Sequence, residues 1–413
     1  FAAAVLTPTL VEAAAPEVSG AQSALKPTEM EVSLAYLLTL RDAESGAWRA
    51  DAGYKLNDSW RVLAKDVPHV GVTALALEAL VLSGQCEKET VAGSKAAIDK
   101  AKDFILSQQD ERGQFRSEGT RLRPHAYALA ALSSLYKVEP STELKAGIEK
   151  GLRFSLDARN MDAPGWYFEP LSRRVDLIET AFQMQAIEAA LAAIGNTDDV
   201  DMLQLIVDGL KAREATSGFA RSAHTDGASG GAGYVRQVTA TGEPRFQATY
   251  RATAAGLWIE RKWFEGGVPA FAEISDALAR FRGDALFEKA SLHFTTLDAE
   301  LILARASCDP SRNGVLNRMG KVLAIDALSL FAEFRTISGE FQAGVGAGPS
   351  FTQAASCLVL AQANVGSHLL FPVTIENHEG ARKVFKGSAN TTVFDIIVVA
   401  MGDAEWLSRD TSG

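Results

Sequence analysis

Four carboxylate side chains interrupt segments of this 413-residue chain that are otherwise rich in Ala, Leu and Thr: Glu78, Glu179, Asp298 and Glu300. Carboxylates that face each other across a cavity suit cleavage of a glycosidic bond, because one protonates the leaving oxygen and the other acts on the opposite side of the sugar. Asp298 and Glu300 would point about 200° apart on a helix, so both cannot face one cavity. A saccharide site would also normally offer exposed Trp platforms, and two of the six tryptophans, Trp48 and Trp166, belong to turns instead.

The segments that carry these carboxylates belong to an internal repeat. An apolar, Ala-rich pattern opened by a small polar residue recurs about every fifty to sixty positions. Its six copies begin at Thr73, His125, Thr180, Thr249, Thr296 and Thr352. Most copies follow a turn that combines Gly with an aromatic residue, as at Gly113-Gln-Phe115 and Gly165-Trp166. The glycine suits the backbone that ends a helix, and the aromatic ring suits the gap between neighbouring hairpins.

A second, more polar helix is expected before each turn. Residues 95–102 and 143–150 carry Lys, Glu and Asp on one face, which is typical of an outer layer in water. The Ala-rich segments have hardly a charge, so they must be surrounded by protein. We therefore predict an all-α fold, an (α/α)6 toroid of six outer/inner helix pairs, over residues 28–365.

Two turns carry a resemblance to a known superfamily. Gln109-Asp-Glu-Arg-Gly-Gln-Phe115 and Asp42-Ala-Glu-Ser-Gly-Ala-Trp48 resemble the QxxxGxW signature of the prenyltransferase and squalene-cyclase repeat superfamily. The resemblance implies the toroid. It does not by itself imply chemistry, because the same ring occurs in terpene cyclases, protein prenyltransferases and complement-type thioester domains.

The residue sets behind those three chemistries are missing. Phe351 stands where protein prenyltransferases place a zinc-binding His, and no Asp-x-Cys occurs. Asp198-Asp199-Val200-Asp201 is the string nearest to the acid motif of squalene-type cyclases, but it precedes a helix and suits capping. Gln85-Cys86-Glu87-Lys88 lacks the downstream Gln of a thioester site. The sequence thus predicts no metal, no cofactor and no catalytic residue of these kinds.

All inner helices of a toroid point the same way, so their amino-terminal residues meet at one mouth. Helix amino termini favour anionic groups. We expect ligand or partner contacts from the side chains at this mouth, namely His125, Glu179, Tyr250, Arg251, His293 and Gln353. The alternative is that the threonines cap their helices and the histidines bond to loop carbonyls.

Two excursions interrupt the repeat, Arg49–Pro68 in the first unit and Ser217–Phe246 in the fourth. They are interpreted as docking loops or a lid, or alternatively as tolerated surface insertions. Exposed aromatic and Arg side chains anchor protein partners. The corresponding candidates are Trp60, Arg61, His224, Tyr234 and Arg236.

The net charge and the two ends of the chain bear on its partners and its cellular location. The 41 basic and 51 acidic residues give a net charge of −10 without a basic stripe, so nucleic acid is not expected as a partner. Residues 1–27 are interpreted as an Ala/Pro-rich tail or the remnant of a targeting segment, which favours an extracytoplasmic (periplasmic or secreted) location, with the cytoplasm as the alternative. No stretch reaches the roughly 18 apolar residues of a membrane span. Residues 366–413 are expected to form an extension packed on the toroid.

Because each catalytic set of the superfamily is absent, the sequence favours a non-catalytic binding or assembly subunit within a larger extracytoplasmic complex. Other protein subunits are the expected partners, and a small molecule or lipid is a further candidate ligand. Two alternatives stay open. One is an enzyme of terpenoid or prenyl chemistry with a non-standard site, and the other is a carbohydrate-active α/α-barrel enzyme.

Overall fold

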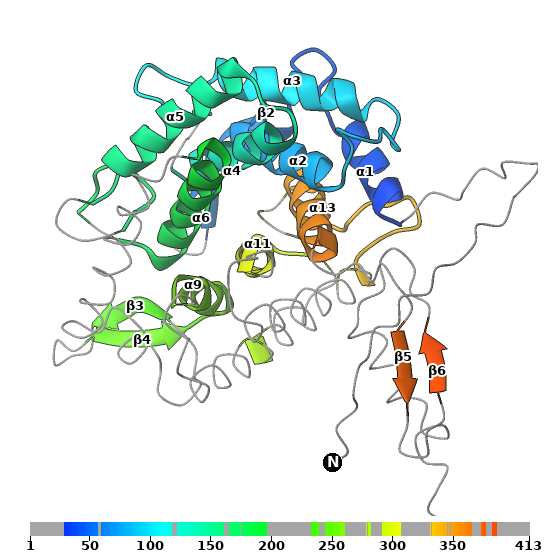
Figure 1. Ribbon diagram of the computed structural model, residues 1–413. Helices are drawn as coiled ribbons and strands as arrows, with labels where there is room; N and C mark the ends of the chain where they lie inside the picture. Colours follow the sequence, from blue (N-terminus) through cyan, green and yellow to red (C-terminus); the bar gives the residue numbers. More distant parts are fainter. Residues whose placement is uncertain are drawn as a thin grey trace, which may run out of the picture. The chain divides into compact units, whose positions relative to one another are not determined.

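The fold is described from a computed structural model (Figure 1). It describes residues 29–56, 59–117, 122–160, 165–173, 175–195, 233–238, 244–260, 278, 280–281, 291–306, 331, 333–344, 346, 348–365, 373–376 and 382–385. The chain divides into two compact units, one formed by residues 28–362 and the other by residues 1–27 together with 363–413.

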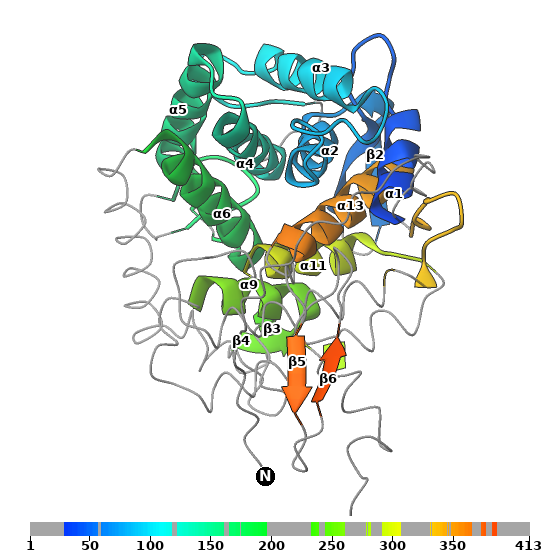
Figure 2. The same ribbon diagram turned by 45° about the vertical axis from the view of Figure 1, so that its right-hand side comes forward.

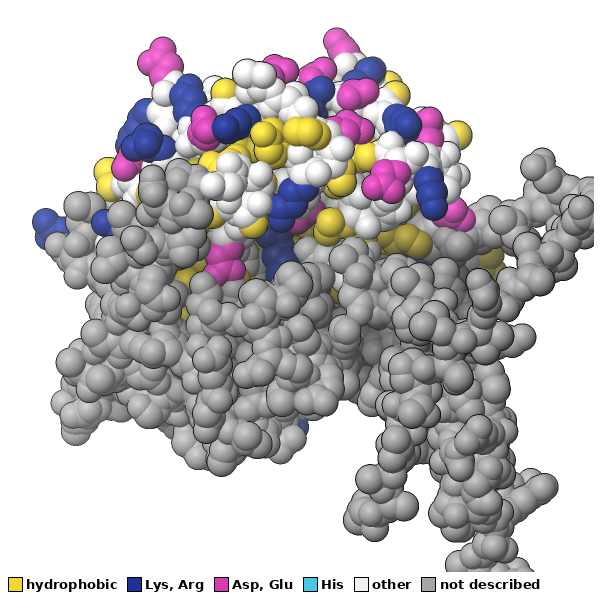
Figure 3. Space-filling model, viewed as in Figure 1, with side chains coloured by type: hydrophobic (Ala, Val, Ile, Leu, Met, Phe, Trp, Pro, Cys, Tyr) yellow, Lys and Arg dark blue, Asp and Glu magenta, His cyan; other side chains and the backbone are white. Residues whose placement is uncertain are grey.

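Helices of two kinds build the larger unit, and their composition explains their places. The apolar inner helices are α2 (Val70–Leu82), α4 (Leu122–Val138), α6 (Leu177–Ile194), α9 (Tyr250–Glu260), α11 (Phe294–Ala306) and α13 (Pro349–Val365). The described outer helices are α1 (Glu29–Thr39), α3 (Ser94–Ser107) and α5 (Thr142–Asp157). Figure 2 shows α2 and α4 lying inside the arc made by α3 and α5. The outer helices bury only one face, and Figure 3 shows Lys, Arg, Asp and Glu side chains interspersed over that layer. The predicted all-α toroid is confirmed.

One hydrogen bond recurs between each described aromatic turn and the inner helix that follows it. The backbone N–H of the turn aromatic donates to a side chain in the first two turns of that helix. The donor and acceptor pairs are Trp48 to Thr73 Oγ1 (3.0 Å), Phe115 to His125 Nδ1 (3.1 Å), Trp166 to Thr180 Oγ1 (3.1 Å) and Phe341 to Gln353 Oε1 (2.9 Å). The four turn aromatics are at most 1 % exposed, which confirms their expected role as plugs between hairpins.

In three of these turns the glycine lies against the next outer helix, whereas Gly165 lies against Val175 and Thr180. A Cβ atom on Gly46 would lie 2.5 Å from Lys100 Cβ of α3, and one on Gly113 would lie 2.3 Å from the Lys150 carbonyl oxygen of α5. In the sixth unit a Cβ on Gly339 would lie 2.6 Å from the carbonyl oxygen of Val32, which belongs to the first outer helix, α1. The turn of the sixth unit therefore packs on the outer helix of the first unit in the same way as the turn of the first unit packs on the outer helix of the second. This contact closes the ring.

Both excursions from the repeat contain a β-hairpin directly before an inner helix, where sequence analysis expected loops. Strands β1 (Arg49–Leu56) and β2 (Ser59–Pro68) pair antiparallel and lead into α2. Strands β3 (Gly233–Val238) and β4 (Pro244–Ala248) pair in the same way and lead into α9. The smaller unit contains a third antiparallel pair, β5 (Val373–Glu376) with β6 (Arg382–Phe385).

Among the described helices, α6 alone is long and apolar enough to cross a membrane by length and composition. Two thirds of it (67 %) is buried inside the protein, where it contacts α4, α5 and α9. Its buried face also carries Glu179, Gln183 and Gln185, which make polar contacts to other helices. It is built as a core helix of the toroid.

Candidate functional site

A buried ion-pair network lies near the amino-terminal ends of four inner helices. The guanidinium group of Arg123 on α4 donates through Nη1 to Asp298 Oδ2 of α11 at 2.7 Å, and through Nη2 to Glu179 Oε1 of α6. Arg251 Nη1 of α9 reaches the same Asp298 oxygen at 3.4 Å. Tyr127 follows Arg123 by one helical turn on α4, so it lies on the same face. We call these five residues the Arg123 cluster.

Two aromatic rings support the guanidinium of Arg123. Its central carbon lies 5.1 Å from the ring centroid of Phe182 and 5.5 Å from that of Phe294. The guanidinium is planar and weakly hydrated, so it tolerates such a setting better than an ammonium group. Burial alone would lower the pKa of Arg123, but the negative charges of Asp298 and Glu179 raise it, so this cation stays charged.

The two carboxylates of the cluster have different surroundings. Asp298 is fully buried and shares one oxygen between two arginines. Burial raises the pKa of Glu179, against the opposing effect of Arg123, its only cationic partner among the described residues. Glu179 therefore keeps its proton to higher pH than an ordinary glutamate does. Two carboxylates in unlike environments are the arrangement in which one serves as an acid and the other as a base.

Several buried polar atoms of the cluster are left without a protein partner. Within the described part of the chain, no hydrogen-bond partner exists for Glu179 Oε2, Asp298 Oδ1, the Tyr127 hydroxyl or Arg123 Nε. Leaving such a group unpaired costs about 1 to 3 kcal/mol, and folded proteins rarely leave it so. The atoms comprise two acceptors and two donors. This set is suited to a ligand that both donates and accepts hydrogen bonds.

Glu300 takes a separate place from Asp298, although both belong to α11. Its carboxylate accepts a hydrogen bond from the hydroxyl of Tyr250 on α9. Asp298 instead contacts α4 and α9 through arginines. The two carboxylates of α11 therefore have different partners, as their angular separation on a helix predicts.

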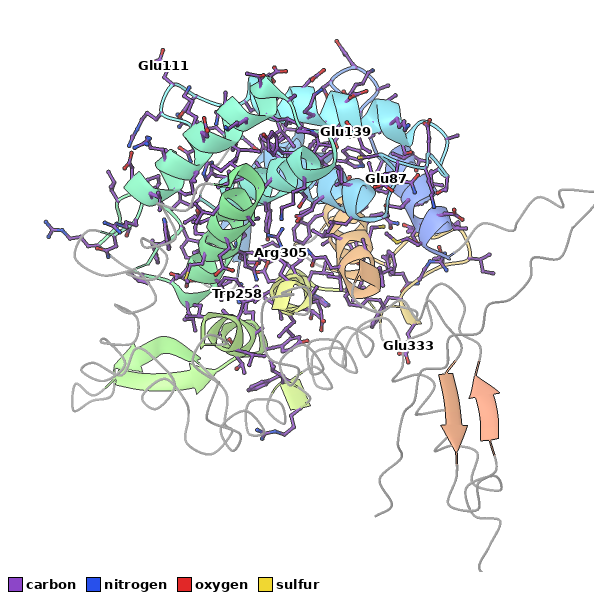
Figure 4. All side chains as sticks on the ribbon, viewed as in Figure 1. Glu87, Glu111, Glu139, Trp258, Arg305 and Glu333 are labelled. Atoms are coloured by element: carbon purple, nitrogen blue, oxygen red, sulfur yellow. The ribbon has the colours of Figure 1, made fainter. Side chains whose placement is uncertain are left out.

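A second buried ion pair lies toward the other end of α11. Arg305 Nη2 donates to Glu78 Oε2 of α2, and Ser134 Oγ of α4 lies 3.3 Å from the other oxygen of Glu78. Figure 4 shows Arg305 among the inner helices, whereas Glu111 lies at the outer edge. Both carboxylate oxygens of Glu78 thus have protein partners, so this pair differs from the Arg123 cluster and is suited to fixing α11 in place.

The structure places the predicted mouth residues in two groups. Glu179 and Arg251 belong to the Arg123 cluster, and Tyr250 lies beside it against Glu300. His125 and Gln353 face the outer layer instead. His125 bonds to Phe115 and to Ser155 Oγ (3.0 Å), and Gln353 donates to the carbonyl oxygens of Ser33 and Gly339 at 2.8 and 2.9 Å.

His293 is half-buried directly before α11. The candidate residues of the two excursions have side chains outside the described part of the chain. Trp60 and Arg61 belong to β2, and Tyr234 and Arg236 belong to β3, in strands whose side chains fall outside the described part, as does all of His224.

Sequence reasoning missed Arg123 and Tyr127, and it considered Asp298 only as one of four carboxylates on the apolar segments. Arg123 could have been found from its angular position on the inner helix relative to the residue that bonds the aromatic turn. Thr73, His125, Thr180 and Gln353 bond outward to the aromatic turns. A residue two positions earlier on a helix lies about 200° away, toward the middle of the ring, and Arg123 holds that position relative to His125. An arginine on such an apolar helix also requires buried carboxylate partners.

Comparison with known proteins gives a fold but no sequence family. No family model matches the chain, and no curated protein sequence matches it. Among solved structures, it is similar to an inactive variant of an α-1,6-mannanase from Salegentibacter sp. HEL1_6 in complex with α-1,6-mannotriose. That match has a TM-score of 0.55 at 10 % identity and covers 82 % of this chain and 99 % of the mannanase. The chain shares the α/α toroid of this enzyme.

Two further structures score lower. A cellobiose 2-epimerase from Bacillus thermoamylovorans B4167 has a TM-score of 0.48 at 10 % identity, with 81 % of this chain and 98 % of that chain covered. A type II terpene cyclase from Scytonema has a TM-score of 0.45 at 12 % identity, with 82 % and 97 % covered. Scores below 0.5 are too low to carry a functional argument.

These matches correct the interpretation of the chain as a non-catalytic binding or assembly subunit. The matches with a TM-score of 0.55 are structures of the α-1,6-mannanase, and they favour the carbohydrate-enzyme alternative. The earlier interpretation was based on the absence of prenyltransferase, cyclase and thioester residue sets. That absence has no bearing on a glycosidase, which needs only two suitably placed carboxylates.

Proposed function

We propose that this protein is a carbohydrate-active enzyme that hydrolyses a glycosidic bond at the Arg123 cluster. The observation that carries the proposal is the set of buried atoms without protein partners, two carboxylate oxygens and two donors, gathered near the amino-terminal ends of the inner helices. Sugar hydroxyls donate and accept hydrogen bonds, so they can satisfy all four atoms. The shared toroid of an α-1,6-mannanase supports the same conclusion.

Each charged residue of the cluster has a role in this proposal. Glu179, whose pKa is raised by burial, donates its proton to the leaving glycosidic oxygen. Asp298 acts on the opposite side of the sugar, either by activating water or as a nucleophile, while Arg123 and Arg251 compensate its negative charge. Arg123 joins both carboxylates through the two terminal nitrogens of one guanidinium, so it also fixes their separation.

The test is the release of reducing ends from polysaccharides by the full-length chain. α-1,6-Mannan is the first substrate, followed by other α- and β-linked glycans. Glu179→Gln and Asp298→Asn keep the size of each side chain and remove the acid or the base, and each should lower kcat by at least about a hundredfold. Glu149→Gln on the exposed face of α5 is the control, because Glu149 makes only a surface contact with Lys145 at 3.8 Å.

Two results would reject this assignment. If the wild-type chain releases no product from any glycan, the proposed activity is wrong. If it is active and Asp298→Asn matches the control, the activity belongs to another place on the molecule.

An extracytoplasmic location agrees with an activity on polysaccharides and remains a proposal, based on the apolar and small residues of the first 27 positions. Association with other protein subunits through the β1–β2 and β3–β4 hairpins is likewise a proposal, separate from catalysis. Appearance of the protein in the periplasmic fraction or the medium tests the first, and co-purification with and without residues 222–243 tests the second.

A further inference from the structure

Tyr127 is buried where the Arg123 cluster has its unpaired acceptors. Its side chain is 5 % exposed, and its hydroxyl has no hydrogen-bond partner within the described part of the chain. Its ring meets Phe182 edge-on, with 5.2 Å between centroids and 88° between planes. Phe182 is also the ring that supports the guanidinium of Arg123. Packing therefore fixes the position of the phenol relative to Arg123, and so to both carboxylates.

The electrostatic setting of Tyr127 keeps its hydroxyl a hydrogen-bond donor. Burial and then the negative charge of Asp298 raise its pKa well above the ordinary value, with a smaller contribution from Glu179 and opposing effects of Arg123 and Arg305. Of the unpaired oxygens of the cluster, Asp298 Oδ1 accepts hydrogen bonds, and Glu179 Oε2 carries the proton when Glu179 acts as the acid. The phenol donor and the carboxylate acceptor belong to one buried cluster and do not bond to each other, so a group that both accepts and donates can satisfy them.

We infer that Tyr127 is a substrate-binding residue of the site, whose O–H group donates to a sugar hydroxyl that in turn donates to a carboxylate of the Arg123 cluster. This inference rests on the proposed function and adds a residue that neither the repeat pattern nor the comparisons assign. It also defines the ligand chemistry. A neutral sugar hydroxyl fits this place, because it can accept from the phenol and donate to the carboxylate.

Tyr127→Phe separates this role from a structural one. The substitution removes only the hydroxyl, keeps the ring on Phe182 and deletes a buried polar atom that has no described protein partner. The thermal midpoint of unfolding should therefore stay the same or rise, while kcat/KM on the active glycan falls by at least about tenfold. Tyr136→Phe is the matched control on the same helix, because Tyr136 is partly buried away from the cluster, and it should change neither quantity.

Substrates that lack one hydroxyl sharpen the test. A set of analogues of the cleaved glycan, each lacking one hydroxyl, is compared with the parent glycan. The wild-type protein should cleave one of these analogues more slowly, and Tyr127→Phe should cleave that analogue no more slowly than the wild type does, because both changes remove the same hydrogen bond. A mere packing role would give additive losses for every analogue.

Three outcomes are decisive. Unchanged kcat/KM in Tyr127→Phe overturns the inference and leaves the proposed function intact. A lower midpoint together with lower activity identifies Tyr127 as structural and also overturns it. A wild-type chain that acts on no glycan rejects the proposed function and the inference with it.

Discussion

Arg123 and Asp298 are 175 positions apart in the sequence, and their side chains form a buried ion pair with 2.7 Å between Nη1 and Oδ2. The pair joins the second inner helix of the toroid to the fifth. Glu179 on the third inner helix bonds to the same guanidinium, so one arginine holds three inner helices together. The same contacts that stabilise this part of the core also position the two carboxylates proposed for catalysis.

Replacing Arg123 by Met should destabilise the protein by about 3 to 5 kcal/mol, because it removes the cationic partner of Glu179 and leaves Asp298 with only Arg251 at 3.4 Å. Urea unfolding of the full-length chain measures this. Arg116→Met is the control, since Arg116 is exposed and pairs with Asp110 at 3.4 Å, and it should cost less than about 1 kcal/mol. Equal losses in the two variants would show that the Arg123 network does not contribute to stability.

The pH dependence of stability should reveal His125. Burial lowers the pKa of this imidazole to about 4, below its unfolded value of 6.5. Between these values the unfolded chain binds more protons, so the free energy of unfolding falls as pH is lowered from about 6.5 toward about 4. For one fully buried group the loss is roughly 3 kcal/mol. His69, whose pKa burial also lowers to about 4, adds a contribution of the same sign.

His125→Gln tests this assignment, because Gln353 already accepts the equivalent turn hydrogen bond in the sixth unit. The variant should fold and should lose about half of the acid-side slope in unfolding measured across pH 4 to 6.5. A slope as steep as that of the wild type would mean that His125 does not titrate in this range.

Two glycines with positive φ, Gly113 in an aromatic turn and Gly93 directly before α3, should respond differently to alanine. Gly113 has φ +101°, and a Cβ there would lie 2.3 Å from the Lys150 carbonyl oxygen. Gly93 has φ +82°, and a Cβ built on it would have no atom within 4 Å. Gly93→Ala should therefore cost about 1 to 2 kcal/mol from backbone strain alone, and Gly113→Ala about 1 to 3 kcal/mol more. Thermal or urea unfolding compares them, and equal costs would contradict the close packing of the turn on α5.

Activity should depend on pH through Glu179. An acid that must donate a proton works only below its pKa, and burial raises the pKa of Glu179 above the ordinary 4.5. The pH at which kcat/KM falls on the alkaline side should therefore lie above 4.5. Glu149→Gln should leave this pH unchanged, whereas a fall at the ordinary carboxyl pKa would speak against Glu179 as the acid.

The repeat allowed the toroid to be predicted, because six copies of one pattern require one arrangement of hairpins. It also placed Glu179 and Arg251 near a common mouth, since helix starts can be read from the pattern. It could not assign His125 and Gln353 to the outer layer, because this depends on how each inner helix is rotated about its axis. The pairing of Arg123 with Asp298 is set by packing between helices far apart in the chain. The β1–β2 hairpin was missed although Arg49–Leu56 alternates, with Ala50, Ala52, Tyr54 and Leu56 on one face, because the segment was interpreted only as an interruption of the helical repeat.

The central claim is that substrate binds at the Arg123 cluster, and a crystal structure of the Asp298→Asn variant with an oligosaccharide that the wild-type chain cleaves tests it most directly. We expect sugar oxygens within hydrogen-bond distance of Glu179 Oε2 and of the Tyr127 hydroxyl, with Arg123 still paired to Glu179. An oligosaccharide bound at the β1–β2 or β3–β4 hairpin, with the Arg123 cluster unchanged and closed, would contradict the claim.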